Sequence, residues 1–219
     1  MSPTTAVLAG ATGLVGSYCL DVLLEDAFYD RVITVGRRAA PVEHPKLTQR
    51  VIEYDKLSPG HLEGVTHVFC CLGTTMRKAG SEEAFRRVDH HYPLALARLA
   101  ASLGAERFLL VSSVGADPKA GTFYLRVKGE VERDLEALPF AGLYLFRPSI
   151  LLGSRREERP GEQLGARLAR AFEWMMVGGL RKYRPMPAAV LARAMVAAGE
   201  RAPNGTYVLQ FDEIGRYAG

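Results

Sequence analysis

The stretch 7-VLAGATGLVGSYCL-20 begins as a short apolar run, is broken by glycines at positions 10, 13 and 16, and continues with apolar residues at helical spacing. A chain can pass from a strand into a helix without three residues that lack side chains. Glycine permits a positive φ and removes the Cβ that would hold another group away from the backbone. The three glycines therefore indicate that something comes close to the backbone at this strand-to-helix turn.

Apolar runs rich in β-branched residues alternate with longer amphipathic stretches along most of the chain. Because apolar strands that alternate with helices are typical of a parallel sheet covered on both faces, the sequence predicts an α/β fold with a doubly wound sheet. Pro93 is expected to kink or divide the longest helix. The predicted strands are 5–9, 31–35, 49–54, 67–72, 107–111 and 142–146, and the predicted helices are 14–24, 81–103 and 123–138.

The character of the sequence changes after Pro148. The charged, turn-rich segment RREERPGEQLG at 155–165 is followed by the helical pattern ARLARAFEWMM at 166–176, a further helix at 187–198 and a short strand within NGTYVLQF. We expect one domain over residues 1–219, in which residues 149–219 contribute a small C-terminal substrate lobe.

Composition narrows the class of protein. The 219 residues are 48% hydrophobic and 24% charged, which suits a single well-packed globular domain, and no apolar run approaches the roughly 20 residues that span a bilayer. The net charge of +4 is spread along the chain, which disfavours a nucleic-acid track. The three cysteines are expected to be buried thiols, and no basic segment precedes the first apolar run, so a cytoplasmic protein is expected.

In a doubly wound sheet, the turn from the first strand into the first helix is where a dinucleotide pyrophosphate binds. The helix N-terminus supplies free N–H groups and a partial positive charge, and glycines allow the phosphates to approach. The spacing here is Gly-x-x-Gly-x-x-Gly, after a strand and before an amphipathic helix. We expect the pyrophosphate to contact Gly10, Thr12, Gly13, Leu14, Val15 and Gly16.

The end of the second strand indicates which dinucleotide is bound. At this position an acidic residue accepts a hydrogen bond from the adenosine ribose 2′-hydroxyl, whereas arginine pairs with a 2′-phosphate. The chain carries Arg37 and Arg38 here, with no carboxylate before Glu43. The sequence therefore favours NADP(H) over NAD(H).

Other strand ends complete the expected cofactor site. Gly73, between Leu72 and Thr74, would let the backbone lie beside the cofactor after the fourth strand, and Tyr54 would lie near the adenine. Pro148 is expected to turn the backbone beneath the nicotinamide.

Ser112 and Ser113 follow the fifth strand, and Tyr124 and Lys128 lie four residues apart on the next helix, so they share one face. An ammonium group close to a phenol favours the phenolate, which can exchange a proton with a carbonyl or alcohol oxygen while hydride moves at the carbon. Lys128 could also hold the nicotinamide ribose. A serine hydroxyl from the strand end can orient the reacting oxygen.

These motifs resemble the extended and atypical branches of the short-chain dehydrogenase/reductase superfamily. The strings FCCLGTTMRKAGSEEAFRRVDHHYPLALARLA, FYLRVKGEVE and FRPSILLGSRREERPGE are similar to the Tat-interacting-protein group of atypical short-chain reductases, over about residues 7–187. The resemblance implies a Rossmann-type fold, bound NADP(H), and a catalytic set of Ser113, Tyr124 and Lys128. Where the extended branch often carries Asn, this chain has Asp89.

The sequence thus predicts an NADP(H)-dependent oxidoreductase acting on a small carbonyl or alcohol. Two alternatives stay open: an NADPH-sensing protein that regulates a partner without turnover, and a nucleotide-sugar epimerase. A homo-oligomer or a regulatory protein partner is also left open. No metal site is expected, because His90 and His91 point in different directions on a helix and no third ligand is suitably spaced.

Overall fold

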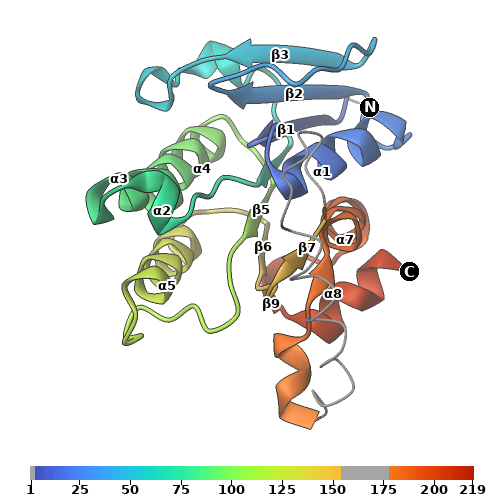
Figure 1. Cartoon of the computed structure of the whole chain (residues 1–219). Coiled ribbons are helices and arrows are strands. Elements are labelled where there is room, and N and C mark those ends of the chain that lie inside the picture. Colours follow the sequence, from blue (N-terminus) through green and yellow to red (C-terminus); the bar gives the residue numbers. More distant parts are fainter. Residues whose placement is uncertain (1–2, 154–177) are drawn as a thin grey trace.

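The chain folds around one parallel sheet of seven strands (Figure 1). The computed structural model describes residues 3–153 and 178–219. The order β3-β2-β1-β4-β5-β6-β9 reverses direction between β1 and β4, which is the topological switch point of a doubly wound sheet. The strands are β1 (Thr5–Ala9), β2 (Arg31–Gly36), β3 (Leu47–Val51), β4 (His67–Cys70), β5 (Arg107–Val111), β6 (Gly142–Phe146) and β9 (Gly205–Leu209).

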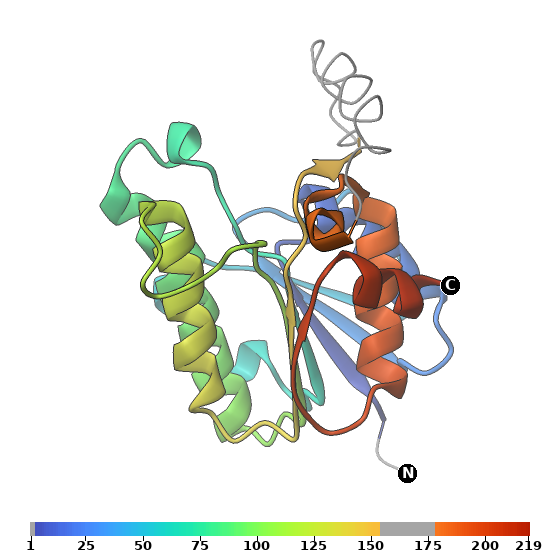
Figure 2. The same ribbon diagram turned by 90° about the horizontal axis from the view of Figure 1, so that it is seen from below.

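Helices cover both faces of this sheet, as the view from below in Figure 2 shows. One face carries α1 (Leu14–Glu25), α7 (Ala188–Arg201) and α8 (Phe211–Ala218), and the other carries α4 (Tyr92–Ser102) and α5 (Phe123–Glu136). Each layer has its own apolar core, so side chains that alternate along β1 enter different cores: Leu8 packs on the α1 side and Val7 on the α4 side. The predicted doubly wound α/β fold is confirmed.

Short elements complete the chain. The helices α2 (Met76–Ala79) and α3 (Glu82–Arg86) precede α4, and β7 (Leu151–Leu152) pairs with β8 (Met186–Pro187) in a small second sheet. The short 3₁₀-helices η1 (Tyr54–Lys56), η2 (Pro59–His61) and η5 (Gly178–Tyr183) lie in the connections. Among the described residues, no helix combines the length and the apolar character that crossing a bilayer requires.

Three predicted strands, 5–9, 107–111 and 142–146, have the observed bounds, whereas the predicted strand 49–54 is displaced. The ladder between β2 and β3 ends at Gly36 and Val51, so the residues beyond have no strand to pair with and Tyr54 begins η1 instead.

The predicted helix 81–103 is divided, and the division lies at a π-helical turn, η3 (Arg87–His91). Pro93 lies two residues after it, in the first turn of α4. The helix runs on from η3 into α4 without an interruption, so the missing N–H of Pro93 removes one hydrogen bond beside the π-helical turn.

The C-terminal residues contribute to the main sheet as well. The edge strand β9 pairs with β6, and α7 packs against α1. The predicted helix at 166–176 lies outside the described residues. The assignment of residues 149–219 as a substrate lobe stays a prediction.

The glycine turn after β1 is set by backbone contacts. Gly10 has φ +86°, and a Cβ there would lie 2.6 Å from the carbonyl oxygen of Cys71. A Cβ on Gly16 would lie 2.1 Å from the carbonyl oxygen of Gly10, and the Gly13 N–H donates to that same oxygen at 2.8 Å. The first turn of α1 therefore rests directly on the backbone of the loop that leads into it.

We predict that Gly16→Ala lowers the free energy of unfolding by about 2 kcal/mol or more, because the new methyl group meets backbone that cannot move aside. Urea unfolding measures the change. The control is Gly60→Ala, where an added Cβ meets no atom of the described residues within 4 Å. Equal stability of the two variants would contradict the packing role of Gly16.

Candidate functional site

The topology places the predicted site residues at one edge of the sheet, the edge formed by the carboxyl ends of its strands. In a parallel sheet all strands end on the same side, and the residues that follow β1, β2, β4, β5 and β6 meet there. This edge holds the glycine turn, Arg37 and Arg38, the segment 72–74, the serine pair and Pro148. The sequence-predicted residues thus come from separate parts of the chain to one place.

The glycine turn leaves the N-terminus of α1 open to a ligand. Gly13 is the N-cap residue and has no side chain to bond the first N–H groups of the helix, which also lack partners within the helix. Thr12 is exposed, whereas Val15 is buried in the core, so Val15 can offer a ligand only its main chain. The closely packed glycine backbone therefore fits a phosphate group.

Arg37 and Arg38 are exposed at the end of β2. The Arg37 guanidinium acts to lower the pKa of both Tyr54 and Tyr92, which places this charge near both phenols, although burial dominates and the net pKa of each phenol is raised. The positive charge at the end of β2 is thus within electrostatic reach of η1 and α4.

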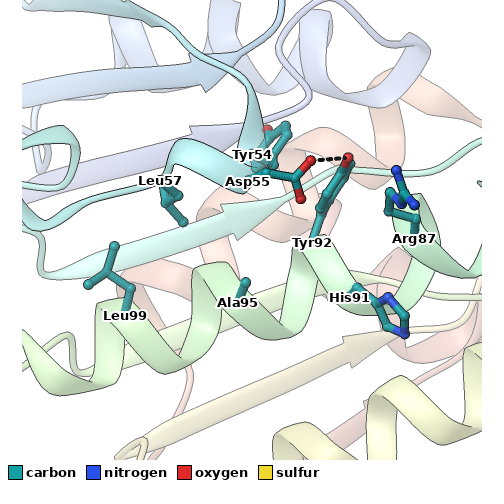
Figure 3. Close-up of a pocket in the computed structure, with 8 residues that line it drawn as sticks. All are labelled: Tyr54, Asp55, Leu57, Arg87, His91, Tyr92, Ala95 and Leu99. Carbon is teal, nitrogen blue, oxygen red and sulfur yellow. Dashed lines mark hydrogen bonds between the residues drawn. The ribbon is translucent and has the colours of Figure 1, made fainter.

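A cavity of about 620 Å³ lies between η1 and α4 (Figure 3). The rings of Tyr54 and Tyr92 stack with centroids 5.1 Å apart, and the Tyr92 hydroxyl donates to Asp55 Oδ2 at 3.4 Å. Tyr54 itself is buried and donates to the Val35 carbonyl at 2.8 Å. The lining residues are Tyr54, Asp55, Leu57, Arg87, His91, Tyr92, Ala95 and Leu99.

Sequence reasoning found Tyr54 but missed Tyr92 and this cavity. Tyr92 belongs to the apolar pattern of a helix, and only the fold shows that it faces the residues after β3.

The residues expected to react lie on and around α5. Tyr124 is 36% exposed, and its ring packs against the buried ring of Phe85 at 5.6 Å between centroids. Lys128 is buried one turn further along α5 and forms an ion pair with Asp89 at 2.8 Å. The Tyr124 phenol is therefore accessible to solvent, and the Lys128–Asp89 ion pair is buried beneath it.

The two serines after β5 differ in their surroundings. Ser113 is half-buried, and its hydroxyl donates to the Val114 carbonyl at 3.3 Å. Ser112 is buried, and its Oγ has no hydrogen-bond partner among the described residues. The greater exposure of Ser113 agrees with its choice as the residue that would meet a substrate.

The position of α5 is fixed by a second ion pair. Glu132 is buried on α5 and accepts from Arg147 Nε at 3.0 Å, and Arg147 directly precedes Pro148 at the end of β6. Glu132 raises the pKa of the Arg147 guanidinium. The helix that carries Tyr124 is thereby tied to the segment expected beneath the nicotinamide.

His90 and His91 do not form a metal site with other described residues, among which no group of three or more His, Cys, Asp or Glu side chains is arranged to hold an ion. His90 Nε2 instead pairs with Asp134 Oδ2 on α5 at 2.8 Å.

A family model described as the NAD dependent epimerase/dehydratase family matches residues 6–137. This chain belongs to that family. It is 38% identical to Protein HTATIP2 of Rattus norvegicus over 205 residues, which cover 90% of this chain and 81% of the relative. The resemblance to the extended short-chain dehydrogenase/reductases and the Tat-interacting-protein group is confirmed.

Solved structures of the same fold belong to nucleotide-sugar enzymes. MoeE5 in complex with UDP-glucuronic acid and NAD matches with a TM-score of 0.73 at 20% identity, over 94% of this chain and 75% of that one. The UDP-N-acetylglucosamine 4-epimerase from Methanobrevibacter ruminantium matches with a TM-score of 0.71 at 15% identity, over 96% and 77% of the two chains. At these identities the likeness establishes the Rossmann-type fold of the family member.

The expected cytoplasmic location is wrong. Protein fmp52, mitochondrial, of Aspergillus fumigatus is 35% identical over 206 residues, covering 90% of this chain and 88% of the relative, and relatives from Aspergillus clavatus and Candida glabrata carry the same mitochondrial designation. The prediction failed because buried thiols and the lack of a basic segment before the first apolar run argue only against secretion, and neither distinguishes the cytoplasm from another compartment.

We predict that Glu132→Gln lowers the free energy of unfolding by about 3 kcal/mol, because the Arg147 charge loses its buried partner. Chemical denaturation at pH 7 measures the loss. The matched control is Glu83→Gln, which removes the carboxylate of an exposed pair with Arg87 and is expected to change stability by under about 0.5 kcal/mol. A loss no larger than that of the control would show that the pair does not anchor α5.

Proposed function

We propose that this family member is an NADP(H)-dependent oxidoreductase that transfers hydride to or from a small carbonyl or alcohol compound. The observation that carries the proposal is the arrangement on α5, where an accessible phenol, Tyr124, lies one turn from a buried ammonium, Lys128, beside the end of β5. A helix surface has no structural need for a buried lysine below an exposed tyrosine. Such a pair suits acid/base chemistry at an oxygen, because the ammonium can support proton transfer by the phenol.

Each residue has a distinct role in this reaction. In the reducing direction the Tyr124 hydroxyl gives its proton to the carbonyl oxygen, and in the oxidising direction the phenolate takes the proton of the alcohol. The Ser113 hydroxyl donates a hydrogen bond that fixes the same oxygen. The Lys128 ammonium stabilises the negative charge that develops on the Tyr124 oxygen as the proton moves. The bound nicotinamide supplies or accepts the hydride.

We propose that backbone N–H groups bind the pyrophosphate of the dinucleotide and that charged side chains bind its 2′-phosphate. The N–H groups at the start of α1, with Gly10, Thr12, Gly13, Leu14, Val15 and Gly16, would hold the pyrophosphate. Arg37 and Arg38 would pair with the 2′-phosphate, and Tyr54 would lie beside the adenine. Leu72, Gly73, Thr74, Lys128 and Pro148 would line the path towards the nicotinamide.

Nucleotide-sugar epimerisation is a second candidate, favoured by the family's description and by the ligands named in the structural neighbours. It would use the same tyrosine, with the cofactor returned unchanged after each cycle. The two functions separate in one assay, because a reductase consumes NADPH with a carbonyl compound, whereas an epimerase converts a UDP-sugar with no net change in the cofactor. An NADPH sensor would bind the cofactor tightly and do neither.

Cofactor choice gives the first test. We predict that NADPH binds at least tenfold more tightly than NADH, and that the double variant Arg37→Ala/Arg38→Ala loses this preference while its NADH affinity changes by less than about twofold, since each charged hydrogen bond contributes about 1.5–3 kcal/mol. Fluorescence titration measures both. Arg98→Ala, an exposed charge removal on α4, is the control and should keep the preference. Equal affinity of the wild type for both cofactors would refute the assignment to NADP(H).

The acid/base role gives the second test. We predict that Tyr124→Phe lowers kcat by about 100-fold or more on a carbonyl substrate found by screening NADPH consumption, because the proton donor is lost. NADPH affinity should change little. Tyr207→Phe on the edge strand β9 is the control for loss of a tyrosine hydroxyl. Full turnover by Tyr124→Phe would remove this residue from the mechanism.

A further inference from the structure

The carboxylate of Asp89 joins three separate parts of the site. Its Oδ1 lies 2.8 Å from the Lys128 ammonium on α5, and its Oδ2 accepts a hydrogen bond from the Thr74 N–H at 2.8 Å. Both side chains of the ion pair are at least nine-tenths buried. Asp89 therefore connects η3, α5 and the loop that follows β4.

Gly73 lies directly over this ion pair. A Cβ at Gly73 would come within 3.5 Å of Asp89 Oδ1 and 4.0 Å of Lys128 Nζ. The pair is thus covered by the backbone of the segment predicted to lie along the cofactor, which places it under that segment and out of solvent.

The π-helical turn η3 holds Asp89 in position. π-helical turns are rare and are found frequently at functional sites. Two contacts fix this one to α5: Arg86 pairs with Glu130, and His90 Nε2 pairs with Asp134 Oδ2 at 2.8 Å. The turn therefore cannot shift Asp89 along α5 without breaking contacts on either side of it.

The charge of Lys128 depends on its surroundings. Burial alone lowers the pKa of an amine because it disfavours the charged form. The groups that act on Lys128 are Asp89 on η3, Tyr124 on its own helix and the Cys70 thiol at the end of β4, and together they raise its pKa, with Asp89 the largest of the three. The Asp89 carboxylate is thus the main group that opposes burial.

We propose that Asp89 is a positioning residue that holds buried Lys128 in its ammonium form and aims it for the acid/base step at Tyr124. This role rests on the proposed function. The carboxylate does more than accept a hydrogen bond: it supplies the counter-charge without which the ammonium would not persist at this depth.

Lysine NMR tests the proposal directly. The full-length protein is labelled with ¹³C at lysine Cε, the Lys128 signal is assigned by its absence in Lys128→Met, and its chemical shift is followed against pH without cofactor or substrate. In the wild type, Lys128 should stay protonated to a pH at or above that at which the other lysines titrate. In Asp89→Asn, which keeps an acceptor for Thr74, it should lose its proton about one pH unit or more below them, because burial is then opposed only by the weaker effects of Tyr124 and Cys70.

Asp134→Asn is the matched control. It removes a carboxylate that also joins α5 to η3 but pairs with His90, so Lys128 should titrate as in the wild type. If Asp89→Asn does not fold, Asp89→Ser removes the same charge with a smaller side chain, and Asp89→Glu should restore a late titration. A Lys128 signal that titrates with the exposed lysines in the folded charge-removal variant would overturn the proposal.

The consequence for catalysis is measured separately. On a substrate of the wild type, Asp89→Asn should lower kcat by a factor similar to that of Lys128→Met, and the double variant should be no slower than Lys128→Met alone. A double variant slower than either would mean that Asp89 acts independently of Lys128. The lysine titration does not require turnover. If the protein proves not to be an oxidoreductase, the titration result still stands. If Asp89→Asn leaves the Lys128 titration unchanged, only the role of Asp89 is refuted.

Discussion

The carbonyl oxygen of Gly10 is the contact on which the site depends. It accepts the Gly13 N–H at 2.8 Å and lies where a Cβ of residue 16 would otherwise stand. With no side chain between them, α1 starts against the end of β1, and its free N–H groups face the edge of the sheet where the strand order reverses. A bulkier turn would push the helix away from this edge. The open helix N-terminus, and the pyrophosphate site that we propose there, follow from that single close approach.

The part of the site around Tyr124 depends on charged side chains, whereas the glycine turn depends on a close approach of backbone. Lys128 is buried with Asp89, covered by Gly73, and carried on a helix that Glu132 ties to Arg147. A buried ion pair is a poor source of stability, because desolvation offsets most of the attraction. Its presence beneath an accessible phenol is better explained by chemistry at that phenol. In the proposed function, the glycine turn binds the pyrophosphate and the Lys128–Asp89 ion pair supports the proton transfer at Tyr124.

The sequence was informative wherever a local pattern decides the structure. The strands 5–9, 107–111 and 142–146, the glycine turn and the arginine pair can be read from periodicity and composition because their neighbours in sequence determine them. Asp89 and Tyr92 were beyond such reasoning. Their partners, Lys128 and Tyr54, are far away in sequence. The π-helical turn, which contains Asp89 and ends just before Tyr92, also changes the helical register that a pattern assumes. The displaced strand β3 has the same cause, since its end is set by where β2 stops pairing.

We propose above all that one edge of this sheet holds a phosphorylated nicotinamide dinucleotide. A crystal structure of the protein grown with NADPH tests it most directly. We expect the pyrophosphate against the N–H groups at the start of α1, the 2′-phosphate between Arg37 and Arg38, and the nicotinamide ribose within hydrogen-bond distance of Lys128. Density for the dinucleotide elsewhere on the surface, or crystals that take up none at millimolar NADPH, would contradict it.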